Sequence, residues 1–62
     1  MKLADTNLTH KDIMEFDRLQ ENVGVIASWT YIEEVTGQEF YDEDARSLED
    51  EMFDVIDETR NI

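Results

Sequence analysis

The 62-residue chain lacks cysteine and long apolar runs, and it has only five basic residues. Without cysteine it can form no disulfide, thiol nucleophile or cysteine-ligated zinc site. Small secreted domains usually rely on disulfides, so their absence favours a reducing cytoplasm. No apolar run is long enough for a signal peptide or a membrane span. We therefore expect a cytoplasmic protein without a membrane partner.

A chain of this length is expected to form one small domain. Domains of about 60 residues bury only about 60% of their unfolded surface, so the stability should be marginal. Hydrophobic residues make up 40% of the chain, which is enough material for a core. Because self-association can supplement a thin core, a homodimer is one expected state.

The formal net charge is −12, and it is concentrated in the second half of the chain. Residues 1–32 contain five acidic and three basic residues, whereas residues 33–62 contain twelve acidic and two basic residues. Such a field repels nucleic acid and anionic lipid, and it attracts basic proteins. The composition thus predicts a basic protein partner and no direct contact with nucleic acid.

The first helix is predicted over residues 10–22. Thr9 suits the N-cap position, and Asp12 stands three residues later, in the position of a capping box. Gly24 favours the left-handed conformation that ends many helices. Residues 1–8 have no usable period and are expected to be flexible.

The middle segment, residues 25–41, supports two interpretations. A helix over residues 28–36 is favoured, because Thr30 and Glu33 have capping-box spacing and Gly37 can end the helix. The alternative is a β-hairpin, since apolar residues alternate along the chain at Val25, Ala27, Trp29, Tyr31 and Val35.

The third predicted helix, residues 43–59, has two opposed faces. Its apolar stripe consists of Ala45, Leu48, Met52, Val55 and Ile56. The opposite stripe is acidic and consists of Glu43, Asp50, Asp54 and Asp57, with Glu51 and Glu58 at one flank. The predicted fold class is therefore mainly α, a small three-helix domain with an acidic amphipathic C-terminal helix. The alternative is an α+β fold with a central hairpin between two helices.

The acidic residues of this third helix differ in their effect on its stability. Those at its start, residues 42–44, interact favourably with the helix dipole. Asp57 and Glu58 lie at its end, where they add repulsion that the sequence suggests Arg60 partly relieves. Helix stability alone therefore does not explain the acidic residues in the second half of this predicted helix.

No catalytic residue, cofactor or metal site is predicted. A calcium-binding EF-hand loop beginning at Asp42 would need Gly at its sixth position and Glu at its twelfth, where the chain has Ser47 and Phe53. His10 is followed four residues later by Met14 rather than by a second metal ligand. We expect His10 to be a solvated residue of the first helical turn.

The aromatic residues are expected mainly in the core. Phe53 projects to the flank of the acidic helix, where it either packs against the middle segment or is an exposed anchor for a partner. The principal cluster is predicted to contain Trp29, Tyr31, Phe40 and Tyr41, with Phe16 and Phe53 at a distance.

The acidic stripe predicts a non-enzymatic inhibitor of a basic, nucleic-acid-binding protein. Asp50, Asp54 and Asp57 recur about 5 to 6 Å apart along a helix axis, so they form a row that can occupy a groove built for a phosphate backbone. We expect these three residues to make the central contacts. The rim would consist of Glu43, Glu51 and Glu58, and the apolar anchor would be Phe53 or Tyr41. Small phage-encoded inhibitors of host proteins often share this acidic character, which is an analogy in composition.

The alternative function is that of a dimerising acidic helical module, or an antitoxin-like partner, that binds through its apolar stripe. The two functions differ in their salt dependence. A charge-driven complex weakens steeply between roughly 50 and 200 mM salt, whereas a complex formed through the stripe should hardly change.

Overall fold

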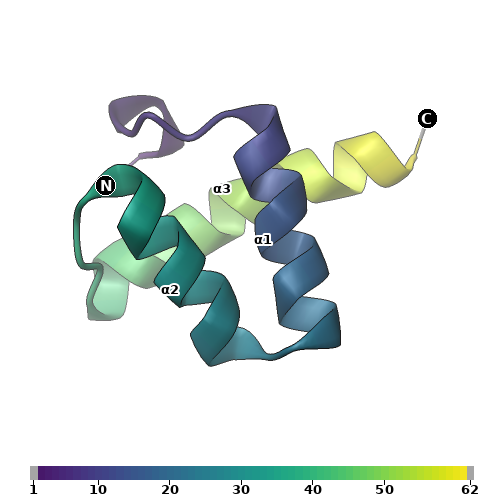
Figure 1. Cartoon of the computed structure of the whole chain (residues 1–62). Coiled ribbons are helices and arrows are strands. Elements are labelled where there is room, and N and C mark those ends of the chain that lie inside the picture. The colour runs from purple at the N-terminus through teal and green to yellow at the C-terminus, as the bar shows by residue number, and fades with distance from the viewer. Residues whose placement is uncertain (1, 62) are drawn as a thin grey trace.

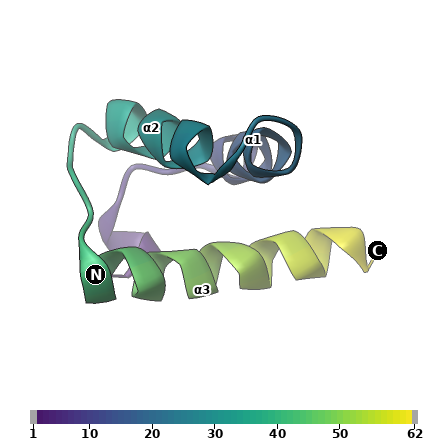
Figure 2. The same ribbon diagram turned by 90° about the horizontal axis from the view of Figure 1, so that it is seen from below.

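The computed structural model describes residues 2–61, which are helical apart from short connections. A 3-10 turn, η1 (Leu3–Asp5), precedes the helices α1 (His10–Asn22), α2 (Val25–Thr36) and α3 (Asp42–Arg60) (Figure 1). Helices α1 and α2 lie side by side in one layer, and α3 forms a second layer (Figure 2). The mainly α, three-helix class is confirmed. The hairpin alternative is wrong, because the described residues contain no strand.

Helix α1 begins with the predicted capping box. The Asp12 N–H donates to Thr9 Oγ1 (3.2 Å), and the Thr9 N–H donates to Asp12 Oδ2 (3.0 Å). At the other end, the N–H groups of Val23 and Gly24 donate to the Leu19 carbonyl (2.8 and 2.9 Å). Gly24 has a φ of +144°, which residues with a side chain rarely adopt. This glycine lets the chain turn directly from α1 into α2.

Helix α2 begins at Val25, earlier than the predicted start near residue 28. Gly24 ends the turn and is also the N-cap of α2, so no separate linker precedes the helix. The capping box predicted at Thr30 does not form, because Thr30 lies inside the helix and its hydroxyl donates to the Ile26 carbonyl (2.8 Å). Gly37 ends α2 as predicted, with a φ of +70°.

The N-terminal segment is bonded to α2 and α3, although the sequence predicts a flexible end. The Leu3 N–H donates to Glu51 Oε2 (2.6 Å), and Asn7 Nδ2 donates to the Val35 carbonyl (3.0 Å). Leu3 also packs against the core. Met1 lies outside the described residues. These contacts come from residues distant in sequence, which the local pattern does not reveal.

The core lies between the two layers and centres on Phe16. Its buried ring packs edge-on against Trp29 of α2 (centroids 5.4 Å apart) and Phe53 of α3 (6.3 Å). Trp29 also contacts Phe40, which precedes α3 (6.1 Å). The aromatic cluster therefore includes Phe16 and Phe53, which are predicted at a distance, and excludes Tyr41, which is exposed. The other buried apolar side chains are Ile13, Ile32, Leu48, Met52 and Ile56.

The apolar stripe of α3 is confirmed as the face that meets the α1–α2 layer. Leu48, Met52 and Ile56 are buried, and Ala45 and Val55 are partly buried against the same cluster. The helix is thus fixed by one side. Its opposite side is left to solvent.

Leu48→Ala should lower the free energy of unfolding by about 2–5 kcal/mol, because the fully buried side chain leaves a cavity in a small core. Urea unfolding followed by far-UV circular dichroism measures the change. The neighbouring Ser47 is exposed, so Ser47→Ala should change stability by less than about 0.5 kcal/mol. Equal effects of the two substitutions would contradict the burial of the stripe.

Asp12 links the start of α1 to α2. Its Oδ1 accepts a hydrogen bond from the Tyr31 hydroxyl (2.9 Å), in addition to the capping bond from Thr9. The hydrogen bond from the Thr9 backbone, followed by that from Tyr31, lowers the pKa of Asp12 below its ordinary value of 3.8. Since this pKa is lower in the folded chain, the Asp12 carboxylate stabilises the fold above pH 3.8. This contribution is lost as the pH falls through the folded-state value.

Asp12→Ala should therefore lower the free energy of unfolding by about 1 kcal/mol at neutral pH, and by less at about pH 2.5. Urea unfolding of parent and variant at both pH values measures the difference. Ser47→Ala, at an exposed and uncharged position, is the control and should show no comparable pH dependence. An Asp12→Ala effect of the same size at both pH values would exclude a role for the Asp12 charge.

Candidate protein-binding surface on α3

The solvent side of α3 carries a row of carboxylates. Glu43, Asp50, Asp54, Asp57 and Glu58 are exposed, and we call these five residues the outer acidic face. The first four lie within about 60° of one another around the helix and span about 21 Å along its axis. Figure 2 shows the α1–α2 layer on one side of α3. Because the opposite stripe is buried against that layer, the outer acidic face is on the other side of the helix.

The carboxylates of α1, in contrast, have partners within the chain. Glu15 forms an ion pair with Arg18 on the same helix. Asp17 and Glu21 both bind Arg60 Nη2, at 2.8 and 2.6 Å, from the last turn of α3. Two of the five basic residues are thus engaged with α1 carboxylates.

The outer acidic face has no such compensation. Within residues 2–61, none of its five side chains makes a hydrogen bond or an ion pair with another residue. Arg46, the one basic residue in the sequence between residues 42 and 58, is exposed and forms no ion pair with them. None of the five carboxylates is therefore held in an ion pair within the described part of the chain.

Arg60, in the last turn of α3, forms its ion pairs with Asp17 and Glu21 of α1 rather than with Asp57 or Glu58. Its hydrogen bond to Glu21, followed by the charges of Asp17 and Glu21, raises the pKa of Arg60. The guanidinium is therefore held by α1. Asp57 and Glu58 keep their unfavourable position at the negative end of the helix dipole.

Glu51, predicted at the rim of the binding surface, is half-buried. Its Oε2 accepts the hydrogen bond from the Leu3 N–H, so the side chain holds η1 against α3. This structural role was not visible from the sequence, because the bond joins residues 48 positions apart. A contact between Glu51 and a partner stays a prediction.

The two predicted apolar anchors differ in exposure. Phe53 is half-buried and packs against Phe16 of α1, rather than serving as an exposed side chain. Tyr41, at the N-cap of α3, is 68% exposed, and its hydroxyl donates to Glu39. This hydrogen bond, together with the Glu39 charge, raises the pKa of Tyr41. Of the two residues, Tyr41 is the more exposed, and a contact of either one with a partner stays a prediction.

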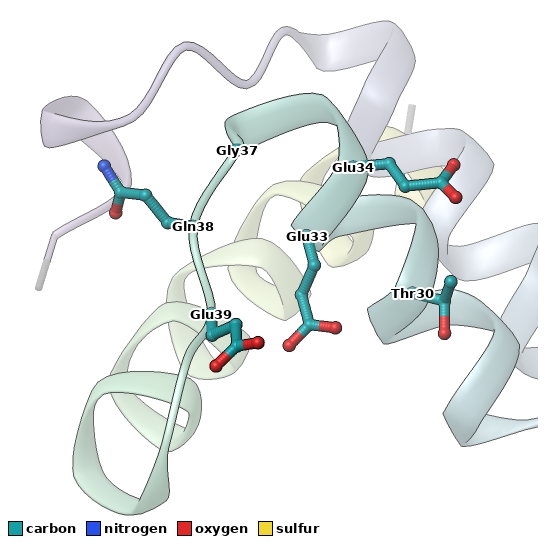
Figure 3. Close-up of a pocket in the computed structure, with 6 residues that line it drawn as sticks. All are labelled: Thr30, Glu33, Glu34, Gly37, Gln38 and Glu39. Atoms are coloured by element: carbon teal, nitrogen blue, oxygen red, sulfur yellow. The ribbon is translucent and has the colours of Figure 1, made fainter.

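A second acidic feature, which the sequence predictions missed, lies where α2 ends. A shallow hollow of about 350 Å³ is lined by Thr30, Glu33, Glu34, Gly37, Gln38 and Glu39 (Figure 3). The carboxylates of Glu33 and Glu39 point toward each other, whereas Glu34 points away. The acidic residues were visible in the sequence. The position of Glu39 beside Glu33 was not, because it depends on the path of the chain after Gly37.

No group of three or more His, Cys, Asp or Glu side chains within residues 2–61 is arranged to hold a metal ion. His10, exposed as predicted, has its Nε2 2.9 Å from Thr59 Oγ1, and this hydrogen bond joins the start of α1 to the end of α3. None of the helices described is both long and apolar enough to cross a membrane.

No protein-family model, curated protein or solved structure matches the chain.

The charges of Glu43 and Asp57 should affect stability in opposite directions, because negative charge complements the helix dipole at the start of α3 and opposes it at the end. Glu43→Gln and Asp57→Asn each remove one exposed charge from the outer acidic face. Both variants therefore lose a similar amount of repulsion between carboxylates, and the difference between them reports the helix dipole. Asp57→Asn should be the more stable variant by about 0.5–2 kcal/mol at low ionic strength. Urea unfolding measures this difference, which should shrink in about 1 M salt. The reverse order would contradict the dipole argument.

Proposed function

We propose that the chain is a small, non-enzymatic, cytoplasmic protein that inhibits a basic, nucleic-acid-binding protein by occupying its nucleic-acid site. The observation that carries this proposal is the outer acidic face, with five exposed carboxylates that form no ion pair with another described residue. Such a face attracts a surface rich in Lys and Arg. Nucleic-acid sites are built from the same residues.

The spacing of charge along α3 supports competition with a phosphate backbone. Seven exposed acidic residues occur between Asp42 and Glu58, over about 24 Å of helix. The mean density is roughly one carboxylate per 3.4 Å, which is the axial charge density of one strand of B-DNA, and the widest gap is about 9 Å, between Asp44 and Asp50. A groove that holds one phosphate strand is therefore a suitable partner for α3.

The fold supports binding by holding this row in place before a partner arrives. Leu48, Met52 and Ile56 fix the inner side of α3 in the core. The carboxylates are displayed on a helix whose backbone needs no ordering on association, which reduces the entropic cost of binding. Their mutual repulsion costs stability in a small domain, so solubility alone is a weak explanation for them.

We favour this function over binding through the apolar stripe, because most of that stripe is packed in the core of the single chain. Leu48, Met52 and Ile56 are 0–2% exposed, because they form the core of the monomer. A partner would have to displace the α1–α2 layer to reach them.

Replacing Asp50, Asp54 and Asp57 together by Asn should weaken binding to the basic partner about 10- to 100-fold, if each charge pair contributes about 0.5–1 kcal/mol. The partner is first captured from a cytoplasmic extract on the immobilised chain, with washes of graded salt. Its affinities for parent and variant are then measured, as is its competition with a short nucleic acid. Parent binding should weaken steeply between about 50 and 200 mM salt. The triple variant should remain folded, since the three side chains are exposed and make no described contacts.

The matched control removes three charges from other surfaces. Asp5→Asn, Glu33→Gln and Glu34→Gln change the net charge equally but leave α3 intact. This control should bind about as well as the parent. The proposal fails if the α3 variant binds as tightly as the control, or if the partner holds the chain and nucleic acid at the same time.

A further inference from the structure

The connection between α1 and α2 exposes a group of apolar side chains. Val23, Val25 and Ile26 are 68%, 57% and 85% exposed, and residues 23–27 together line a shallow groove. We call residues 23–27 the apolar corner. In Figure 1 this connection lies at the lower edge of the molecule, away from α3. It is therefore separate from the outer acidic face.

The apolar corner is electrically neutral in a chain with a net charge of −12. No charged residue occurs in the sequence from Asn22 to Ile32. The carboxylate before this stretch, Glu21, is paired with Arg60 at 2.6 Å. Glu33, the first one after it, is about 12 Å along the helix axis from Val25.

Local helix stability does not explain the residues at the corner. The first turn of a helix favours acidic side chains, yet the first turn of α2 contains none. Val25 and Ile26 stand there instead, in a chain with 17 acidic residues. The first turn of α2 therefore exposes apolar side chains where helix stability alone would favour acidic ones.

We propose that the apolar corner is the surface through which two copies of this chain associate. Two molecules of the same large negative charge repel wherever carboxylates meet, so they approach most easily where both are neutral. A basic partner, in contrast, is drawn to the acidic surfaces. Contact at the apolar corner leaves the outer acidic face of each copy free. Dimerisation through the corner therefore does not depend on the proposed function.

The size of the corner predicts a weak dimer. The three exposed side chains offer roughly 350 Å² per molecule, which is typical of the largest apolar patch on a monomer. Pairing two corners buries roughly 700 Å², less than the about 1,200 Å² of a specific, stable interface. The dimer should therefore form reversibly and depend on concentration.

Analytical ultracentrifugation of the full chain, from about 10 μM to about 1 mM, tests this inference. The dissociation constant of the dimer should fall at least about tenfold between 0.1 and 1 M NaCl, because the Debye length shrinks from about 10 to about 3 Å. This salt dependence is opposite to that of binding through the outer acidic face. The two proposals can therefore fail separately.

Ile26→Asp should raise the dissociation constant of the dimer at least about tenfold, because it places a charge in the contact. Ser47→Asp adds the same charge at an exposed position of α3 and is the matched control, which should dimerise nearly as the parent does. Val25→Thr keeps the side-chain shape, adds a hydroxyl and should weaken the dimer in the same direction. Circular dichroism should show the parent helix content for all three variants.

Two results would overturn the inference. One is a parent chain that stays monomeric at every concentration and salt, which would leave a different protein as the occupant of the corner. The other is equal dimerisation of Ile26→Asp and Ser47→Asp.

Discussion

Phe16 joins the three helices, because its buried ring contacts Trp29 of α2 and Phe53 of α3 at the same time. A chain of 62 residues buries few other side chains, so this contact strongly limits how α3 can lie against the α1–α2 layer. The side of α3 that meets solvent follows from that packing. The display of charge on the surface is thus a consequence of aromatic contacts in the interior.

Features encoded within one helical turn were predictable from the sequence. The capping box at Thr9 identified the start of α1, and Gly37 identified the end of α2. The spacing of Leu48, Met52 and Ile56 distinguished the buried side of α3 from the acidic one. Each of these signals depends on residues three or four positions apart, and helix geometry places such residues together without tertiary information.

Features that depend on distant residues were not predictable in this way. The bond between Leu3 and Glu51 joins residues 48 positions apart, and Arg60 reaches back 39 positions to Glu21. Each bond uses a charged side chain, Glu51 in the first and Arg60 in the second, whose position in space the composition of the chain does not reveal. The early start of α2 was missed for a different reason. Gly24 both ends one helix and caps the next, whereas the alternation of apolar residues after it is typical of a strand.

Because the charges of the outer acidic face form no ion pairs within the described residues, the folding equilibrium of the chain depends on whether a cationic surface is bound to it. Repulsion along one helix raises the free energy of the folded chain, so a bound cationic surface that offsets it shifts the equilibrium away from unfolded molecules. Proteases cleave mainly chains that have opened, which makes turnover sensitive to this shift. For a domain of marginal stability, the lifetime of the protein in a cell would then follow the supply of its binding partner.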